Sequence, residues 1–110
     1  AECEIAVELL EKMVLNALLA ADRTTPAQVS MLKIQATEIQ QKITELGIDL
    51  AGRCGAVWAD RATDGWRETM PLVPDFAAPA MGTYLFGRAV TIYGGATEIQ
   101  KNLVWRMIGG

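Results

Sequence analysis

Two adjacent glycines near the end of the chain are the residues best suited to bring a ligand close to the backbone. Gly94 and Gly95 stand in "TIYGGATEIQKN", residues 91 to 102, directly before a segment with helical spacing. One interpretation is a turn between helices, in which the glycines supply positive φ, Thr97 caps the next helix and Gln100 completes a capping box. In the other, the missing side chains let a cofactor approach the open N–H groups of the helix start. Spacing alone favours the turn, and both can hold, since a capped helix start still presents about two or three free N–H groups.

Several kinds of chemistry are excluded by residue type. The chain contains no His, which removes Ser-His-Asp and Cys-His machinery, His-ligated metals and imidazole acid–base catalysis. "GGATE" lacks the Gly-Lys-Ser/Thr ending of a P-loop and does not match the dinucleotide fingerprint. The acidic residues are scattered as on solvated faces, and none stands out as an acid–base pair. Cys3 and Cys54 form no CxxC pattern, so no metal site or disulfide framework is expected.

Composition predicts one compact domain without nucleic-acid or membrane partners. The 110 residues are 51% hydrophobic with 4 Pro, which favours a modest core. A formal charge of −3 argues against a nucleic-acid-binding face. Glu11, Lys12 and Asn16 interrupt the first apolar run, so no membrane span is expected. With two widely separated cysteines, a reduced, cytoplasmic setting fits best.

The first half of the chain carries two helical patterns. The first covers residues 2 to 21. The second begins at "TTPAQ", where Thr25 suits the N-cap, Pro26 the first helical position and Gln28 the capping box, and it ends near Gly52. Apolar residues at spacings of three and four in the second helix predict a core-facing seam: Leu32, Ala36, Ile39, Ile43, Leu46 and Leu50.

The second half begins with a loop and returns to helical spacing. Residues 59 to 79 show no sustained period, which predicts a long loop that is either functional or packed against something outside the chain. Its apolar side chains, such as Trp66 and Phe76, favour the second option. Helical spacing resumes over residues 81 to 92 and again after the glycines. No segment alternates with period two for long enough to predict a strand. We therefore expect an all-α, up-and-down four-helix bundle that makes residues 1–110 a single domain.

The stretch "IYGGATEIQKNLVWRMIGG" resembles the closing motif of the acyl-CoA dehydrogenase family. Members typically end in Ile-Tyr-(Glu or Gly)-Gly-Thr/Ser-x-Glu/Gln-Ile-Gln-Arg-Asn and a final helix. Upstream, "SMLKIQATEIQQKITELGIDLAGRCG" is similar to the family's helix that runs from Ala-x-x-Lys into a glycine turn, with Lys33, Gly52 and Gly55 in register. The matches to the closing motif are Ile92, Tyr93, Gly95, Glu98, Ile99, Gln100, Asn102 and Gly109, with Lys101 as a conservative match.

The resemblance implies the C-terminal helical domain of an FAD-dependent enzyme of fatty acid metabolism, with an N-terminal helical domain and a β middle domain elsewhere. In that family a carboxylate removes the α-proton of an acyl-CoA thioester while flavin N5 takes the β-hydrogen as hydride. Many members carry this glutamate directly after the Tyr of the motif, where this chain has Gly94, so no catalytic residue is expected here. Some relatives supply the carboxylate from an earlier helix, which would lie before Ala1.

Carried over residue by residue, the resemblance implies two groups of contacts. Those with the substrate and the flavin ring come from Tyr93, Gly94 and Gly95. Those with the ribityl, phosphate or adenosine part of FAD come from Ala96, Thr97 and Glu98. Arg53 replaces the second Gly of the upstream turn; it either pairs with the FAD pyrophosphate or is a solvated helix-end cation.

Two functions remain open. The chain, which starts at Ala1 and stops at Gly110, is expected to be a piece of a longer flavoenzyme that oxidises acyl-CoA. Alternatively, it comes from a catalytically silent subunit or scaffold of a hetero-oligomeric dehydrogenase. Both imply contacts with other domains of the polypeptide and a homo- or hetero-oligomer, such as a homotetramer built as a dimer of dimers.

Overall fold

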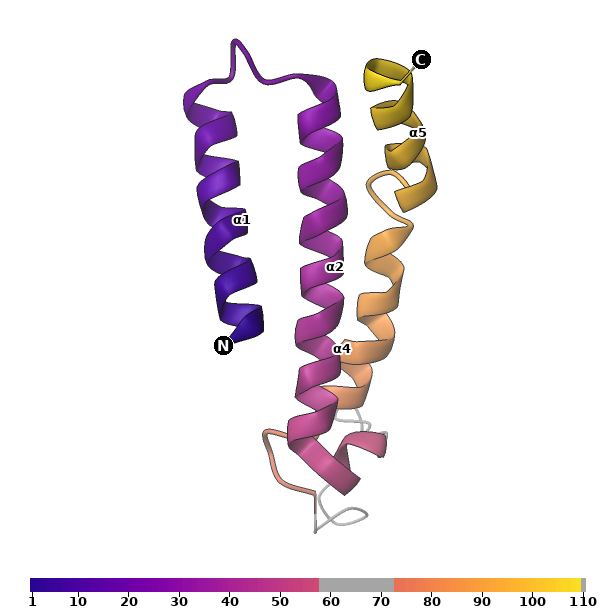
Figure 1. Ribbon diagram of the computed structural model, residues 1–110. Helices are drawn as coiled ribbons and strands as arrows, with labels where there is room; N and C mark the ends of the chain where they lie inside the picture. Colours follow the sequence, from indigo (N-terminus) through magenta and orange to yellow (C-terminus); the bar gives the residue numbers. More distant parts are fainter. Residues whose placement is uncertain (58–72, 110) are drawn as a thin grey trace. The chain divides into compact units, whose positions relative to one another are not determined.

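The computed structural model describes residues 1–57 and 73–109, and among these residues it contains helices and no strand. This confirms the all-α prediction and the four expected helices, whereas residues 59 to 72 of the expected loop lie outside the described residues. In chain order the elements are α1 (Glu2–Leu19), α2 (Pro26–Ala51), the 3-10 helix η1 (Gly52–Ala56), α4 (Ala80–Gly87), the 3-10 helix η2 (Arg88–Thr91) and α5 (Thr97–Ile108) (Figure 1).

The chain divides into two compact units, of which the first comprises Ala1–Gln40 and Val90–Gly110. Within it, α1 and α5 both run antiparallel to the N-terminal half of α2, as up-and-down topology requires (Figure 1). The Thr24 hydroxyl closes the end of α1, donating to the carbonyls of Ala17 at 2.8 Å and Ala20 at 3.0 Å. These carbonyls belong to the last turn of the helix, where intrahelical partners run out. The single-domain organisation of residues 1–110 stays a prediction.

Both ends of α2 follow from local sequence. The Thr25 N–H donates to Gln28 Oε1 at 2.8 Å and the Gln28 N–H donates to Thr25 Oγ1 at 3.3 Å, which is the reciprocal capping box. At the other end, Gly52 adopts a φ of 56°, the left-handed conformation that stops helices and that glycine adopts without steric cost. The predicted start and end of this helix are confirmed.

The face of α2 that the described residues cover is polar, and the prediction of an apolar core seam is wrong over its second half. Ser30, Thr37 and Thr44 recur every seven residues, two helical turns, and the first two are only 5% and 7% exposed. Thr37 and Thr44 satisfy their hydroxyls on carbonyls three residues back, each at 2.8 Å. In contrast, the seam residues Ile43, Leu46 and Leu50 are exposed, so the described residues do not bury that stripe.

In the second unit, Gln41–Ala89, one guanidinium joins α2 to the end of α4. Arg88 donates to Glu45 Oε1 at 2.9 Å, to Thr44 Oγ1 at 3.0 Å and to the Gln41 carbonyl at 3.2 Å, and its guanidinium carbon lies 4.3 Å from the Tyr84 ring centroid. These contacts combine a charge-assisted pair with stacking on an aromatic face. They fix the point at which α4 ends as an α-helix and continues as η2, where the sequence predicted one helix through residue 92.

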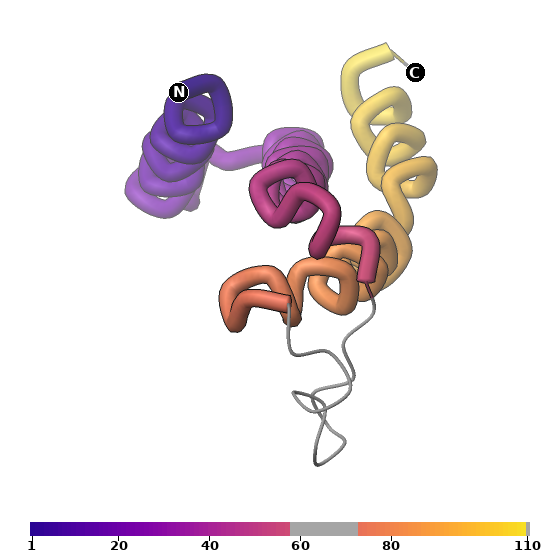
Figure 2. Tube along the Cα trace, turned by 90° about the horizontal axis from the view of Figure 1, so that it is seen from below, coloured from indigo at the N-terminus to yellow at the C-terminus, as the bar shows by residue number. Residues whose placement is uncertain are grey.

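Large apolar side chains contribute little to the interior of either unit. The described residues bury the apolar Ala27, Ala77, Ala78 and Val90, while α1 and α5 bury none of theirs. Within the first unit, α1 lies alongside the N-terminal half of α2 (Figure 2). Within the described ranges, no helix is both long enough and apolar enough to cross a bilayer. The exposed large apolar residues of α1 are Ile5, Leu9, Met13, Val14, Leu15, Leu18 and Leu19.

The contacts of Arg88 predict its effect on stability. Replacing Arg88 with Ala should lower the free energy of unfolding by about 2 kcal/mol, because it removes three hydrogen bonds, one of them to a carboxylate, and the stacking on Tyr84. Glu45→Ala should cost less than about 1 kcal/mol, since it removes a single half-exposed partner. Urea unfolding followed by far-UV circular dichroism measures both, and equal losses for the two variants would contradict this account.

Candidate functional site

The glycine turn, residues 92 to 96, joins η2 to α5 within the first unit. Gly94 has a φ of 69° and Gly95 a φ of 96°, a region that side chains disfavour, as the turn interpretation predicted. Ile92 and Tyr93, which lead into the turn, are exposed. The sequence therefore places glycine where the backbone needs positive φ, and a second role for the turn depends on what surrounds it.

Lys33 of α2 holds the turn on one side. Its ammonium Nζ donates to the Gly95 carbonyl at 2.8 Å and to the Val90 carbonyl at 3.0 Å. The two acceptors flank the segment from the last residues of η2 to the turn, so one side chain fixes both ends of it. No carboxylate of the described residues lies within ion-pair distance of Lys33, and these two carbonyls are its hydrogen-bond partners there.

The two glycines have different surroundings. A Cβ atom placed on Gly94 would have no neighbouring atom within 4 Å, so this position is open. A Cβ on Gly95 would collide with the side-chain amide of Gln100, which folds back over the turn from the first turn of α5. The space that a ligand would need to approach the backbone is thus free at Gly94, whereas at Gly95 the Gln100 side chain occupies it.

The start of α5 departs from the predicted cap. Thr97 is the first residue of the helix, Ala96 occupies the N-cap position without a side-chain hydrogen bond, and the Gln100 N–H donates to the Ala96 carbonyl at 2.9 Å. The prediction that Thr97 and Gln100 form a capping box is therefore wrong. Thr97 Oγ1 is buried and has no hydrogen-bond partner within the described residues. Since no side chain caps this end, the N–H groups of Thr97, Glu98 and Ile99 lack an acceptor among the described residues.

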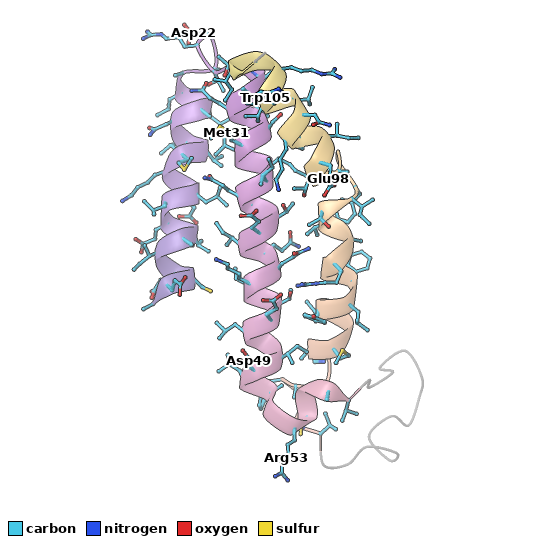
Figure 3. The ribbon with its side chains drawn as sticks, turned by 45° about the vertical axis from the view of Figure 1, so that its right-hand side comes forward. Asp22, Met31, Asp49, Arg53, Glu98 and Trp105 are labelled. Carbon is cyan, nitrogen blue, oxygen red and sulfur yellow. The ribbon has the colours of Figure 1, made fainter. Side chains whose placement is uncertain are left out.

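The predicted site residues fall into two places. One is the consecutive segment from the glycine turn into α5: Tyr93, Gly94, Gly95, Ala96, Thr97 and Glu98. Glu98 is exposed in the first helical turn, where negative charge is favourable (Figure 3). Arg53 belongs to η1 of the second unit, is exposed and points outward there (Figure 3). Its pairing with a pyrophosphate stays a prediction. The described residues contain no cluster of three or more His, Cys, Asp or Glu that could hold a metal ion.

The sequence identified Lys33 only as a match to the family's helix and did not predict its hydrogen bonds to the Val90 and Gly95 carbonyls. The available signal was its position on α2: Lys33 lies three residues after Ser30 and four before Thr37, on the polar face of the helix. A lysine among buried small polar residues needs acceptors, because the buried ammonium otherwise loses its hydration. The carbonyls of Val90, in η2, and of Gly95, in the glycine turn, supply them.

Alanine substitutions at the two glycines separate the cost of a positive φ from the cost of a collision with the Gln100 side chain. Gly94→Ala should destabilise the protein by about 1 kcal/mol, the cost of a left-handed residue with a side chain. Gly95→Ala should cost about 2 kcal/mol or more, because its φ of 96° is less accessible and Gln100 must also move.

Gly47→Ala is the matched control for these variants. Gly47 lies inside α2 without positive φ and with no atom within 4 Å of an added Cβ, so alanine should stabilise it by about 0.5–1 kcal/mol. Urea unfolding gives all three values, and a Gly95→Ala loss no larger than that of Gly94→Ala would show that neither Gln100 nor the larger φ matters.

Comparisons with known proteins identify the family. The family described as "Acyl-CoA dehydrogenase, C-terminal domain" matches residues 1–109. The chain is 29% identical over 101 residues to "Acyl-CoA dehydrogenase IpdE1" of Mycolicibacterium smegmatis, covering 92% of this chain and 22% of that protein. It is 31% identical over 85 residues to the protein of the same name from Mycobacterium tuberculosis, covering 77% and 18%. The chain thus spans about a fifth of the length of these curated relatives, and no solved structure matches it. On the match across nearly its whole length, this chain belongs to the acyl-CoA dehydrogenase C-terminal domain family.

Proposed function

We propose that this chain is the C-terminal domain of an FAD-dependent, cytoplasmic acyl-CoA dehydrogenase and that the glycine turn forms part of its active-site wall. The observation that carries the proposal is the open position at Gly94, next to a helix start without a side-chain cap, in a member of this family. Relatives named acyl-CoA dehydrogenase support the reaction class, the α,β-dehydrogenation of an acyl-CoA thioester.

The residues around the turn fit an electron-rich, partly anionic group such as FAD. The free N–H groups in the first turn of α5 favour hydrogen-bond acceptors and negative charge. The missing side chain at Gly94 leaves the backbone accessible to a flat ring, and the exposed ring of Tyr93 lies next to it in the chain. When bound, FAD would supply the hydride acceptor for the β-hydrogen.

In this proposal the chain's own residues bind and orient. Ala96, Thr97 and Glu98 hold the non-ring part of FAD, and Thr97 Oγ1 offers it a polar atom that is unpartnered within the described residues. Glu98 binds a hydroxyl of the cofactor rather than a phosphate, because like charges repel. Tyr93, Gly94 and Gly95 bound the space for the thioester, and Arg53 contributes to the pyrophosphate of FAD.

Gly94 has no side chain and cannot act as the base, and in this proposal the proton of the substrate goes to a carboxylate outside residues 1–110. The alternative function, a catalytically silent subunit or scaffold, is favoured by the same missing side chain. The exposed apolar residues of α1 and α5 fit either case, because both require cover from other domains or from subunits of a homo- or hetero-oligomer, such as a dimer of dimers.

The visible absorption spectrum of the complete gene product tests the proposal. We expect bound flavin that bleaches when an acyl-CoA is added anaerobically, because substrate oxidation reduces the flavin. A protein with flavin that no acyl-CoA bleaches would favour the silent subunit, and a colourless protein after flavin reconstitution would refute the proposed cofactor.

Side-chain size at position 94 tests whether a ligand uses the open space. Asn tolerates positive φ better than Ala does, so Gly94→Asn should be more stable than Gly94→Ala. Asn is also larger, so it should lower kcat/KM for acyl-CoA more than Ala does, by about tenfold for each 1.4 kcal/mol of lost binding. If activity followed stability instead, with Asn the milder change, the space at Gly94 would play no part in ligand binding.

A further inference from the structure

We propose that Lys33 is a positioning residue for the active site: by holding two carbonyls on the inner side of the glycine turn, it keeps the N–H of Ala96 on the side where ligand binds. This inference rests on the proposed function, because that function gives the turn a ligand. The hydrogen bonds themselves belong to the described structure.

The geometry of the peptide group carries the first step. In a trans peptide the C=O and the N–H point in opposite directions, and the described chain contains no cis peptide bond. The carbonyl of Gly95 points at the Lys33 ammonium, 2.8 Å away. The N–H of Ala96, which belongs to the same peptide group, therefore points away from Lys33. No acceptor for this N–H lies among the described residues.

The second step is the freedom that glycine gives this segment. Gly94 and Gly95 lack the steric barriers that restrict other residues, so the peptide group between them can rotate at little cost. The peptide group between Gly95 and Ala96 is free on the Gly95 side and is restrained on the other side by the negative φ of Ala96. A rotated peptide between Gly95 and Ala96 would present a carbonyl, not an N–H, to the ligand side. Flavins and thioesters offer carbonyl acceptors, and a facing carbonyl would repel them. A fixed donor on the inner side adds to the φ preference of Ala96 and further restricts the tilt of this peptide.

Lys33 is suited to be that donor. It is part-buried on the polar face of α2, in the series with Ser30 and Thr37, so its position is set by a helix rather than by a loop. Its ammonium carries three donors, of which two reach carbonyls: that of Val90, before the turn, and that of Gly95, within the turn. Charge-assisted hydrogen bonds are stronger than neutral ones, and no described carboxylate competes for them.

Substitutions in the complete gene product test the proposal. Lys33→Met keeps the approximate length of the side chain and removes all donors. Lys33→Arg keeps the charge and the donors but places the donors on a planar guanidinium. Lys42→Met, on the same helix but exposed, is the matched control. In Lys33→Met, the affinity for flavin should fall and the KM for acyl-CoA should rise, each by about tenfold, as expected for a lost charge-assisted hydrogen bond. The changes should be smaller in Lys33→Arg and less than about twofold in Lys42→Met.

Hydrogen–deuterium exchange separates this inference from the proposed function. Amides of residues 90–99 should exchange faster in Lys33→Met than in the parent or in Lys42→Met, whether or not the protein holds flavin. Unchanged exchange there would overturn the positioning role. Faster exchange with unchanged flavin affinity and unchanged KM would overturn the claim that the held turn faces the ligand. A parent protein that binds no flavin would refute the proposed function alone, and exchange would still decide whether Lys33 holds the turn.

Discussion

The two hydrogen bonds of Lys33 are the constraint on which the arrangement of the glycine turn depends. Backbone carbonyls that leave solvent must find donors, and those of Val90 and Gly95 find one ammonium from a helix 57 and 62 residues earlier in the chain. This contact sets which way the peptide groups of the turn face and thereby where α5 begins. Gly94, which lies between the two held carbonyls in the sequence, has no atom within 4 Å of an added Cβ.

The sequence predicted the helices of this chain better than it predicted what covers them. The start of α2 at Thr25 and its end at Gly52 depend on neighbours in sequence, so composition and spacing suffice. The covered face of α2 depends on which elements pack there, and spacing cannot reveal this. The apolar stripe of α2 predicts a core seam, yet the small polar Ser30 and Thr37 are buried and Ile43, Leu46 and Leu50 are exposed.

The same short pattern also behaves differently in two places, which shows why the site was only partly predictable. Both "TPAQ" and "TEIQ" place Gln three residues after Thr, and at Thr25 the pair forms a capping box. At Thr97 the chain arrives through two glycines of positive φ, so Ala96 takes the N-cap position and Gln100 lies over Gly95 instead. The positive φ of the glycines was predictable from their residue type. The use of Gln100 and Lys33 was not, because both act through contacts with the turn's backbone.

The open turn and the exposed apolar stripes have a common physical basis. The covered face of α2 carries Lys33, Thr37 and Thr44, which donate to backbone carbonyls, while the second half of its apolar stripe is exposed. Exposed stripes of this kind require another surface. A turn whose outer side carries no side chain at Gly94 and an N–H at Ala96 without a described acceptor equally requires a second surface to become a closed pocket. In the proposed flavoenzyme, the domains and subunits that cover the stripes would therefore also complete the active site, which couples assembly to cofactor binding.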